Sequence, residues 1–355
     1  MMTRLGAIVA VLPLVALQMS AWAAELQPPR RRWNTTCILV FGDSTVDPGN
    51  NNRLATDSKA NFLPYGKDFF NGRPTGRFCN GRLATDFIAE AFGISKSVPA
   101  FLDPDLSPEQ LQYGVSFASA SSGYDEFTAS IANVLPFSKQ LEYLMHYKIH
   151  LRRKVGPAKT EQTLKNALFV VSAGSNDFIQ NYFLFSNRSG QFTVPEYEDF
   201  LITLMFKNIK EMHKLGGTRF LVVGLPPMGC LPLVKTIANT QKCVSSYNDA
   251  AISFNSKVVA QVHALKEISG VRASYLDIYR IISDATQKPK KYGLVEASKG
   301  CCGSGVVEVG ETCKGLRTCS NPSKYLYWDA VHLTERMYQI IADAAGSIIA
   351  KEVLS

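Results

Sequence analysis

The chain has 355 residues, of which 38 are basic and 30 acidic, and its formal net charge is +8 at pH 7. The positive charge is spread along the chain, whereas a nucleic-acid-binding surface needs clustered basic side chains with aromatic residues among them. The composition therefore argues against a nucleic-acid partner. Basic side chains do cluster at Arg30-Arg31-Arg32, in a proline-flanked stretch that we interpret as a solvated arm. A weak attraction to acidic polysaccharide is the alternative.

The N-terminal residues have the three parts of a secretory signal. Arg4 precedes an apolar run over residues 5–17, and Ala21-Trp22-Ala23 supplies the small residues of a cleavage site. We therefore predict a signal peptide over residues 1–23 and an N-terminal arm over residues 24–36. The apolar run is too short to cross a bilayer comfortably, and no later stretch resembles a membrane helix. We expect a secreted, extracellular protein without a membrane span.

Short hydrophobic runs at four places predict buried strands. Each run is continuous rather than alternating, as expected for parallel strands that are covered by helices on both faces. The four predicted strands are Cys37–Phe41, Leu168–Ser172, Arg219–Leu225 and Arg272–Ile278.

Amphipathic patterns around these runs predict helices. One apolar face recurs at spacings of three and four from Tyr247 to Leu265, and another recurs from Met337 to Ile348. Thr334 stands where the second helix needs an N-cap residue. Strands that alternate with helices, without an internal repeat or a low-complexity linker, predict an α/β fold with a parallel sheet. We expect a single domain over residues 37–355.

Eight cysteines in an exported chain predict disulfides. Six of them fall into two local groups, and the adjacent pair Cys301-Cys302, with no paired C-x-x-C spacing, argues against zinc. We expect a bridge within the first group. Since adjacent cysteines do not readily bridge each other, Cys301 and Cys302 should each take one of the later cysteines of the second group. The groups are Cys230 with Cys243, and Cys301 with Cys302, Cys313 and Cys319.

Two cysteines lie outside these groups, and two asparagines are predicted to carry glycans. Cys37 lies in a predicted strand and is expected to be a buried thiol, whereas the sequence leaves the state of Cys79 open. Asn34 and Asn187 each begin an Asn-x-Ser/Thr triplet, so both are predicted glycosylation sites.

One histidine pair has the spacing of a helical metal site. His146 and His150 are four residues apart in HYKIH, but Tyr147 stands where a zinc-protease motif needs glutamate. Neighbouring side chains are basic, so we interpret this stretch as a solvated helix face. We expect neither a metal nor a cofactor.

Reactive side chains follow two of the predicted strands and recur near the C-terminus. Ser44 follows the first strand in Gly-Asp-Ser, and Asn176 follows the second in Gly-Ser-Asn-Asp. In an open parallel sheet these strand ends are where ligands bind. Asp329 precedes His332 by three residues, so one segment can supply both a base and its orienting acid. Asn176 offers an amide donor for an oxyanion.

The chain resembles the plant-type GDSL esterases/lipases of the SGNH hydrolase superfamily from about Cys37 to its C-terminus. Seven blocks carry the resemblance in order: FGDSTVDPGNNN, GRPTGRFCNGRLATDFIAEAFG, GVSFASASSGYD, VSAGSND, LPPMGCLP, KGCCGSG and YWDAVHLTE. The resemblance implies a three-layer α/β/α sandwich with a flavodoxin-like parallel sheet.

The resemblance also implies a role for individual residues. It assigns the nucleophile to Ser44, the base to His332 and the orienting acid to Asp329. The implied oxyanion hole comprises the backbone N–H of Ser44, the side chain of Asn176 and a glycine N–H. Ala120 takes that glycine's place here, and alanine tolerates positive φ less well than glycine. If the loop requires positive φ at residue 120, the third donor is expected to be displaced. The alternative is that neighbouring Ser121 or Ser122 reshapes the loop so that Ala120 keeps a negative φ.

Smaller departures are Thr45 in place of the leucine in the family name and Leu333 in place of a proline common after the histidine. Neither removes a catalytic group.

Together the residues and the resemblance predict a secreted serine esterase or lipase of the cell wall or apoplast. It would hydrolyse acyl or lipid esters through an acyl-enzyme, and we expect a monomer. One alternative is an acyltransferase that passes the same acyl group to an alcohol. Another is a catalytically inactive cell-wall-binding protein on the same fold, which the departure at Ala120 keeps open.

Overall fold

The computed structural model describes residues 34–355. The predicted signal peptide over residues 1–23, the Arg30-Arg31-Arg32 cluster and most of the N-terminal arm lie outside these described residues. Thr35–Ser355 group together as one unit.

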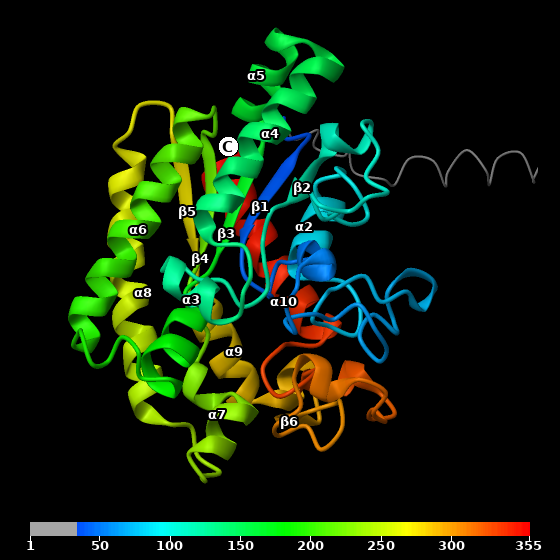
Figure 1. Ribbon diagram of the computed structural model, residues 1–355, viewed down its shortest axis with the longest axis vertical. Helices are drawn as coiled ribbons and strands as arrows, with labels where there is room; N and C mark the ends of the chain where they lie inside the picture. Colours follow the sequence, from blue (N-terminus) through cyan, green and yellow to red (C-terminus); the bar gives the residue numbers. More distant parts are fainter. Residues whose placement is uncertain (1–33) are drawn as a thin grey trace, which may run out of the picture. The chain divides into compact units, whose positions relative to one another are not determined.

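A five-stranded parallel sheet runs through this unit (Figure 1). The strand order is β2-β1-β3-β4-β5, the order of flavodoxin-like sheets. All neighbouring pairs are parallel, and hydrophobic residues fill the central strands because both faces are covered. The strands are β1 (Ile38–Gly42), β2 (Gly114–Ser116), β3 (Leu168–Ser172), β4 (Arg219–Val223) and β5 (Arg272–Leu276).

Helices cover both faces of the sheet, which gives the three layers that the resemblance implies. In Figure 1, α4, α6 and α8 lie on one side of the strands, and α2 and α10 lie on the other. The α-helices are α2 (Ala84–Ala91), α3 (Glu126–Ile131), α4 (Phe137–Val155), α5 (Pro157–Asn166), α6 (Val194–Lys214), α7 (Pro232–Ile237), α8 (Ser245–Lys266), α9 (Ile278–Gln287) and α10 (Glu335–Ile348). A π-helical segment over Asp177–Leu184 follows β3.

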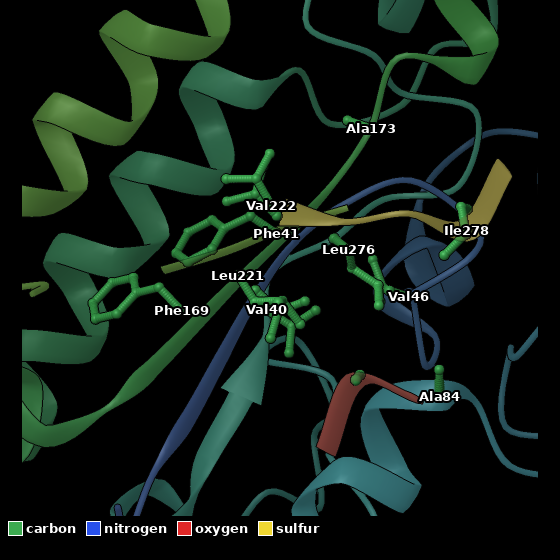
Figure 2. Close-up of a cluster of buried hydrophobic side chains, with 14 of the residues drawn as sticks. Val40, Phe41, Val46, Ala84, Phe169, Ala173, Leu221, Val222, Leu276 and Ile278 are labelled. Atoms are coloured by element: carbon green, nitrogen blue, oxygen red, sulfur yellow. The ribbon is translucent and has the colours of Figure 1, made fainter. Parts of the chain in front are cut away.

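The two faces of the sheet carry different side chains. Because side chains alternate along a strand, Phe41 and Phe169 face one layer, and their rings stack with centroids 6.1 Å apart. In Figure 2 these two rings point to one side of the strands, whereas Val46, Ala84 and Leu276 lie on the other. The aromatic face packs against α4 through Phe137, whose ring stacks on Phe41.

Most predicted elements are present, with small shifts at their ends. The expected strands over 219–225 and 272–278 end at Val223 and Leu276, where loop residues and the start of α9 follow. Thr334 caps α10 by accepting a hydrogen bond from the Met337 N–H at 3.4 Å. The sequence patterns missed β2, which has three residues and gives too short a signal at the sheet edge.

A second, two-stranded parallel sheet joins β6 (Glu296–Gly300) to β7 (Tyr325–Tyr327). The segment between these strands carries two disulfides, and a third lies between β4 and α8. The bridges are Cys301–Cys319, Cys302–Cys313 and Cys230–Cys243. Adjacent Cys301 and Cys302 thus pair with separate partners.

The other cysteines and the predicted modification sites fall in different environments. Cys37 and Cys79 are buried free thiols. Asn34 is exposed and Asn187 is partly exposed. His146 and His150 lie on the outer face of α4, where His146 contacts Glu142 rather than a metal-ligand cluster.

A buried ion pair holds the start of α2, the helix that packs on α10. The Arg77 guanidinium donates to both carboxylate oxygens of Asp86 at 2.9 Å, and these side chains are 4% and 1% exposed. Asp86 also accepts the backbone N–H groups of Leu83 and Val98, at 2.8 and 2.7 Å. These bonds compensate the desolvation of both charges.

Asp86→Ala is expected to lower the free energy of unfolding by about 3–5 kcal/mol, because it leaves the Arg77 charge buried without its partner. Urea denaturation measures this loss. The matched control is Asp105→Ala, which breaks the exposed pair with Arg73 and should cost less than about 1 kcal/mol. Equal losses in the two variants would contradict this account.

Candidate active site

Ser44 lies just beyond β1, the strand between β2 and β3 in the sheet. β1 ends at Gly42, whose φ is +142°, and a side chain there would collide with the Ser172 carbonyl oxygen. The chain therefore needs glycine to leave β1 beside β3. Ser44 follows β1 and Asn176 follows β3, at the point where the strand order reverses. Open α/β sheets bind ligands at this switch point.

Ser44, His332 and Asp329 form a continuous chain of hydrogen bonds. Nε2 of His332 lies 2.8 Å from Oγ of Ser44. Nδ1 of the same ring lies 2.8 Å from Oδ2 of Asp329 and 3.0 Å from Oδ1. Ser44 is 8% exposed and Asp329 is fully buried. This geometry is that of a nucleophile, a base and an orienting acid.

The Asp329–His332 segment is preorganised by its own backbone. Oδ1 of Asp329 accepts the N–H of Val331 at 2.8 Å and the N–H of His332 at 2.6 Å. When an aspartate side chain accepts hydrogen bonds from N–H groups two and three residues later, it holds the intervening backbone in a tight turn. The spacing of three residues therefore holds the acid beside the ring of the base.

Burial would raise the pKa of the Asp329 carboxyl, but its hydrogen bonds and the charge of His332 outweigh burial and hold the pKa below its usual value. A group with a lowered folded-state pKa stabilises the fold above its unfolded pKa. That stability is lost as the pH falls through the folded-state pKa. Asp329 is accordingly ionised at neutral pH.

Tyr65 is a functional-site residue that the sequence analysis missed. Its hydroxyl donates to Oδ2 of Asp329 at 2.7 Å and accepts the Gly310 N–H at 2.8 Å. The side chain is fully buried. Tyr65 precedes Asp329 by 264 residues, and no catalytic spacing joins the two. The local sequence around Tyr65, Pro-Tyr-Gly between Leu63 and Lys67, does not indicate a contact with a catalytic residue.

An aromatic cluster surrounds this contact. The Tyr65 ring packs edge-on against Phe62, Phe78 and Trp328. The Phe78 ring also lies 4.7 Å from the His332 ring. The cluster continues into the disulfide-bonded segment through Cys301, Cys302 and Cys313. The site therefore has a small core of its own beside the main one.

Asp43 holds the turn that presents Ser44. Its Oδ1 accepts the N–H of Thr45 at 2.9 Å and the hydroxyl of Thr45 at 2.7 Å. The Thr45 hydroxyl also lies 3.0 Å from that of Ser172 at the end of β3. Threonine in place of leucine thus adds polar contacts to the turn.

The expectation for Ala120 needs correction. Its N–H donates to Oδ2 of Asp47 at 2.9 Å, and the residue is fully buried. Ala120 is not among the described residues with positive φ, whereas its neighbour Ser121 has a φ of +67°. The left-handed position of this loop is therefore residue 121. Ala120 is neither strained nor available as an oxyanion donor.

Asn176 lies beside Ser44 in the same cavity wall. Its amide nitrogen donates to the Ser122 carbonyl at 2.9 Å, and its amide oxygen accepts from the Gln180 side chain at 2.9 Å. These bonds fix the plane of the amide. A primary amide has two hydrogens, so one is left for a further acceptor.

A largely apolar cavity lies next to these residues and is partly open to solvent. It runs from Ser44 and His332 along the side of the sheet that faces α2 and α10. Its wall is built mainly from aliphatic side chains of several elements, among them Val46, Ile88, Val170, Leu221, Ile282 and Ile341. Cavities of this composition, apolar with a few polar groups, hold small organic ligands.

Two structural findings bear on other predicted features. Among residues 34–355, no group of histidine, cysteine, aspartate or glutamate side chains is arranged to hold a metal ion. Within the same range, no helix combines the length and hydrophobicity that crossing a bilayer requires.

Comparisons with known proteins agree on one family. The model of the family described as GDSL-like lipase/acylhydrolase matches residues 38–345. The Arabidopsis thaliana protein GDSL esterase/lipase At5g45950 is 49% identical over 355 residues, which cover 99% of each chain. GDSL esterase/lipase At5g45960 is 43% identical over 329 residues, 89% of this chain and 88% of the relative. GDSL esterase/lipase At2g42990 is 42% identical over 311 residues, 86% and 89% of the two chains.

Tyr65→Phe is expected to lower the free energy of unfolding at pH 7 by about 1.5–3 kcal/mol, because it removes a hydrogen bond to an ionised carboxylate. The loss should shrink as the pH falls through the folded-state pKa of Asp329, which lies below the usual aspartate value, because the carboxyl then becomes protonated. Urea denaturation at pH 7 and at a series of lower pH values at which the protein is still folded measures these losses. The control is Tyr147→Phe, whose hydroxyl donates to the neutral Leu111 carbonyl. A pH-independent loss in Tyr65→Phe would overturn the link to Asp329.

Proposed function

Because the chain belongs to the GDSL-like lipase/acylhydrolase family, whose members are carboxylic ester hydrolases, we propose that it forms an acyl-enzyme on Ser44. The observation that carries the proposal is the hydrogen-bonded chain from Ser44 through His332 to Asp329 beside an apolar cavity. The cavity suits esters of aliphatic acids.

Each group has a defined task in this mechanism. Oγ of Ser44 attacks the ester carbonyl carbon while Nε2 of His332 takes the hydroxyl proton. The carbonyl π electrons move onto oxygen, and Asp329 stabilises the imidazolium that forms. The tetrahedral intermediate then expels the alcohol, which receives the proton from His332. Water repeats the sequence on the acyl-enzyme and releases the acid.

The developing oxyanion needs donors on the side of the cavity where Ser44 lies. We assign this task to the backbone N–H of Ser44 and the side-chain amide of Asn176. Donors of this kind each contribute about 3 kcal/mol or more to lowering the barrier in other hydrolases. Ala120 is left out of the assignment because its N–H is bonded to Asp47.

We also propose that the protein acts outside the cell. Three disulfides support an oxidising compartment. The predicted signal over residues 1–23 supports the same location. Asn34 and Asn187 are at least partly exposed, which suits the proposed glycosylation.

Labelling with a phosphonate ester tests the nucleophile. Mass spectrometry should find one phosphonyl group per chain, on Ser44, and Ser44→Ala should lower kcat by roughly 10⁴–10⁶-fold. The matched control is Ser175→Ala, which removes another serine hydroxyl from the same cavity wall and should retain activity. Labelling at another serine would overturn the mechanism. Product analysis with glycerol present separates hydrolysis from acyl transfer.

Ala120→Gly is expected to leave kcat unchanged, because the N–H at this position is bonded to Asp47 rather than available to an oxyanion. The variant should be less stable by about 0.4–1 kcal/mol, since glycine gives the unfolded chain more freedom. Steady-state kinetics and urea denaturation of the one variant measure both effects. A raised kcat would contradict this assignment and indicate that the N–H of residue 120 belongs to the oxyanion hole.

A further inference from the structure

Two tyrosine hydroxyls at the cavity have no hydrogen-bond partner among the described residues. Tyr327 belongs to β7 and Tyr338 to α10, and both line the cavity that contains Ser44. The two residues are 0% and 3% exposed. Within residues 34–355 neither hydroxyl oxygen makes a hydrogen bond. Buried hydroxyls nearly always have a partner, so two such groups at one cavity need a physical explanation.

Neighbouring polar groups do not supply the missing bonds. Burial raises the pKa of both phenols, and the Thr286 hydroxyl near Tyr327 and the Leu333 N–H near Tyr338 oppose this effect. Neither contact reaches hydrogen-bond geometry. The Thr286 hydroxyl donates instead to the Ile282 carbonyl at 2.8 Å. The Leu333 N–H can only donate, so the Tyr338 proton still lacks an acceptor.

The rest of the cavity wall favours a hydrocarbon chain. Val170 and Leu221 come from the sheet, and Ile88 and Ile341 come from the helices that cover it. A plain hydrocarbon would match this wall and exclude water from it. It would also leave both tyrosine hydroxyls in an apolar environment without a partner, which is unfavourable.

We propose that the cavity binds the acyl chain of the ester and that Tyr327 and Tyr338 select chains that carry an oxygen atom, such as a hydroxyl group, along their length. The inference rests on the proposed function and deepens it by naming the substrate class: esters of oxygenated aliphatic acids. A hydroxyl on the chain accepts a hydrogen bond from a phenol and donates in return. The two tyrosines are specificity-determining residues, and the chemical step stays with Ser44 and His332.

The test compares esters of one chain length. The probes are p-nitrophenyl decanoate and the isomeric p-nitrophenyl hydroxydecanoates, which carry a single hydroxyl at one position from carbon 6 to carbon 10. Hydroxyls closer to the ester would form lactones. For at least one isomer, kcat/KM of the wild type should exceed that for decanoate by about tenfold, the usual effect of re-pairing a buried hydroxyl. A preference for decanoate over every isomer would overturn the proposal.

Tyr327→Phe and Tyr338→Phe keep the rings and remove only the hydroxyls. The measured ratio is kcat/KM for the favoured hydroxydecanoate divided by kcat/KM for decanoate. In at least one variant this ratio should fall close to one, because decanoate is hydrolysed faster and the hydroxy ester more slowly. Tyr147→Phe is the matched control, because its hydroxyl is paired and lies outside the cavity wall. Its ratio should equal the wild-type ratio. Unchanged ratios in both cavity variants would mean that the hydroxyls contact water only.

p-Nitrophenyl acetate separates failure of this inference from failure of the proposed function. Its two-carbon acyl group is too short to follow the cavity, so its hydrolysis depends on the reacting groups alone. Loss of acetate hydrolysis in Ser44→Ala together with equal rates for decanoate and all hydroxydecanoates would refute the inference and leave the function standing. Acetate hydrolysis that persists in Ser44→Ala would refute the function. Thermal denaturation of each variant identifies any that fail to fold.

Discussion

The site depends on keeping one carboxylate ionised where water does not reach it. Asp329 is fully buried, and an isolated charge there would be very unfavourable. Two backbone N–H groups, the Nδ1 of His332 and the hydroxyl of Tyr65 satisfy its oxygens instead. Because the charge is surrounded by fixed donors, it does not need to reorganise when His332 becomes positive. Such electrostatic preorganisation is what the proposed acyl-enzyme mechanism requires.

The disulfide-bonded segment helps to hold the Tyr65 hydroxyl beside the Asp329 carboxylate. The Gly310 N–H donates to Tyr65 and thereby sets the position of its hydroxyl. Gly310 lies between Cys302 and Cys313, which are joined to each other. Ring packing of Tyr65 on Trp328 fixes the same hydroxyl from the other side. Segments far apart in the chain therefore converge on Asp329, and the bridges limit how far they can separate.

Sequence patterns predicted the parts of the molecule that depend on local chemistry. Strand β3 appears with the expected bounds because a buried parallel strand is a continuous apolar run. The Asp329–His332 spacing was also informative, since the turn is made by the side chain itself. Tyr65 could not be found in this way, because its role arises only when distant segments pack. The sequence left the backbone at Ala120 open because one chain does not reveal which residue of a loop adopts positive φ, and here that residue is Ser121.

The two faces of the sheet pack differently, and the cavity lies on only one of them. On one face, Phe41 stacks against Phe117 and Phe169, with ring centroids 4.9 and 6.1 Å apart. Aromatic contacts of this kind bury much apolar area and stabilise this face of the sheet. On that opposite face, side chains near the strand ends leave space unfilled, which costs stability. A fold that packs one face tightly can tolerate this loss on the other, at the end of the sheet where Ser44 needs room for a substrate.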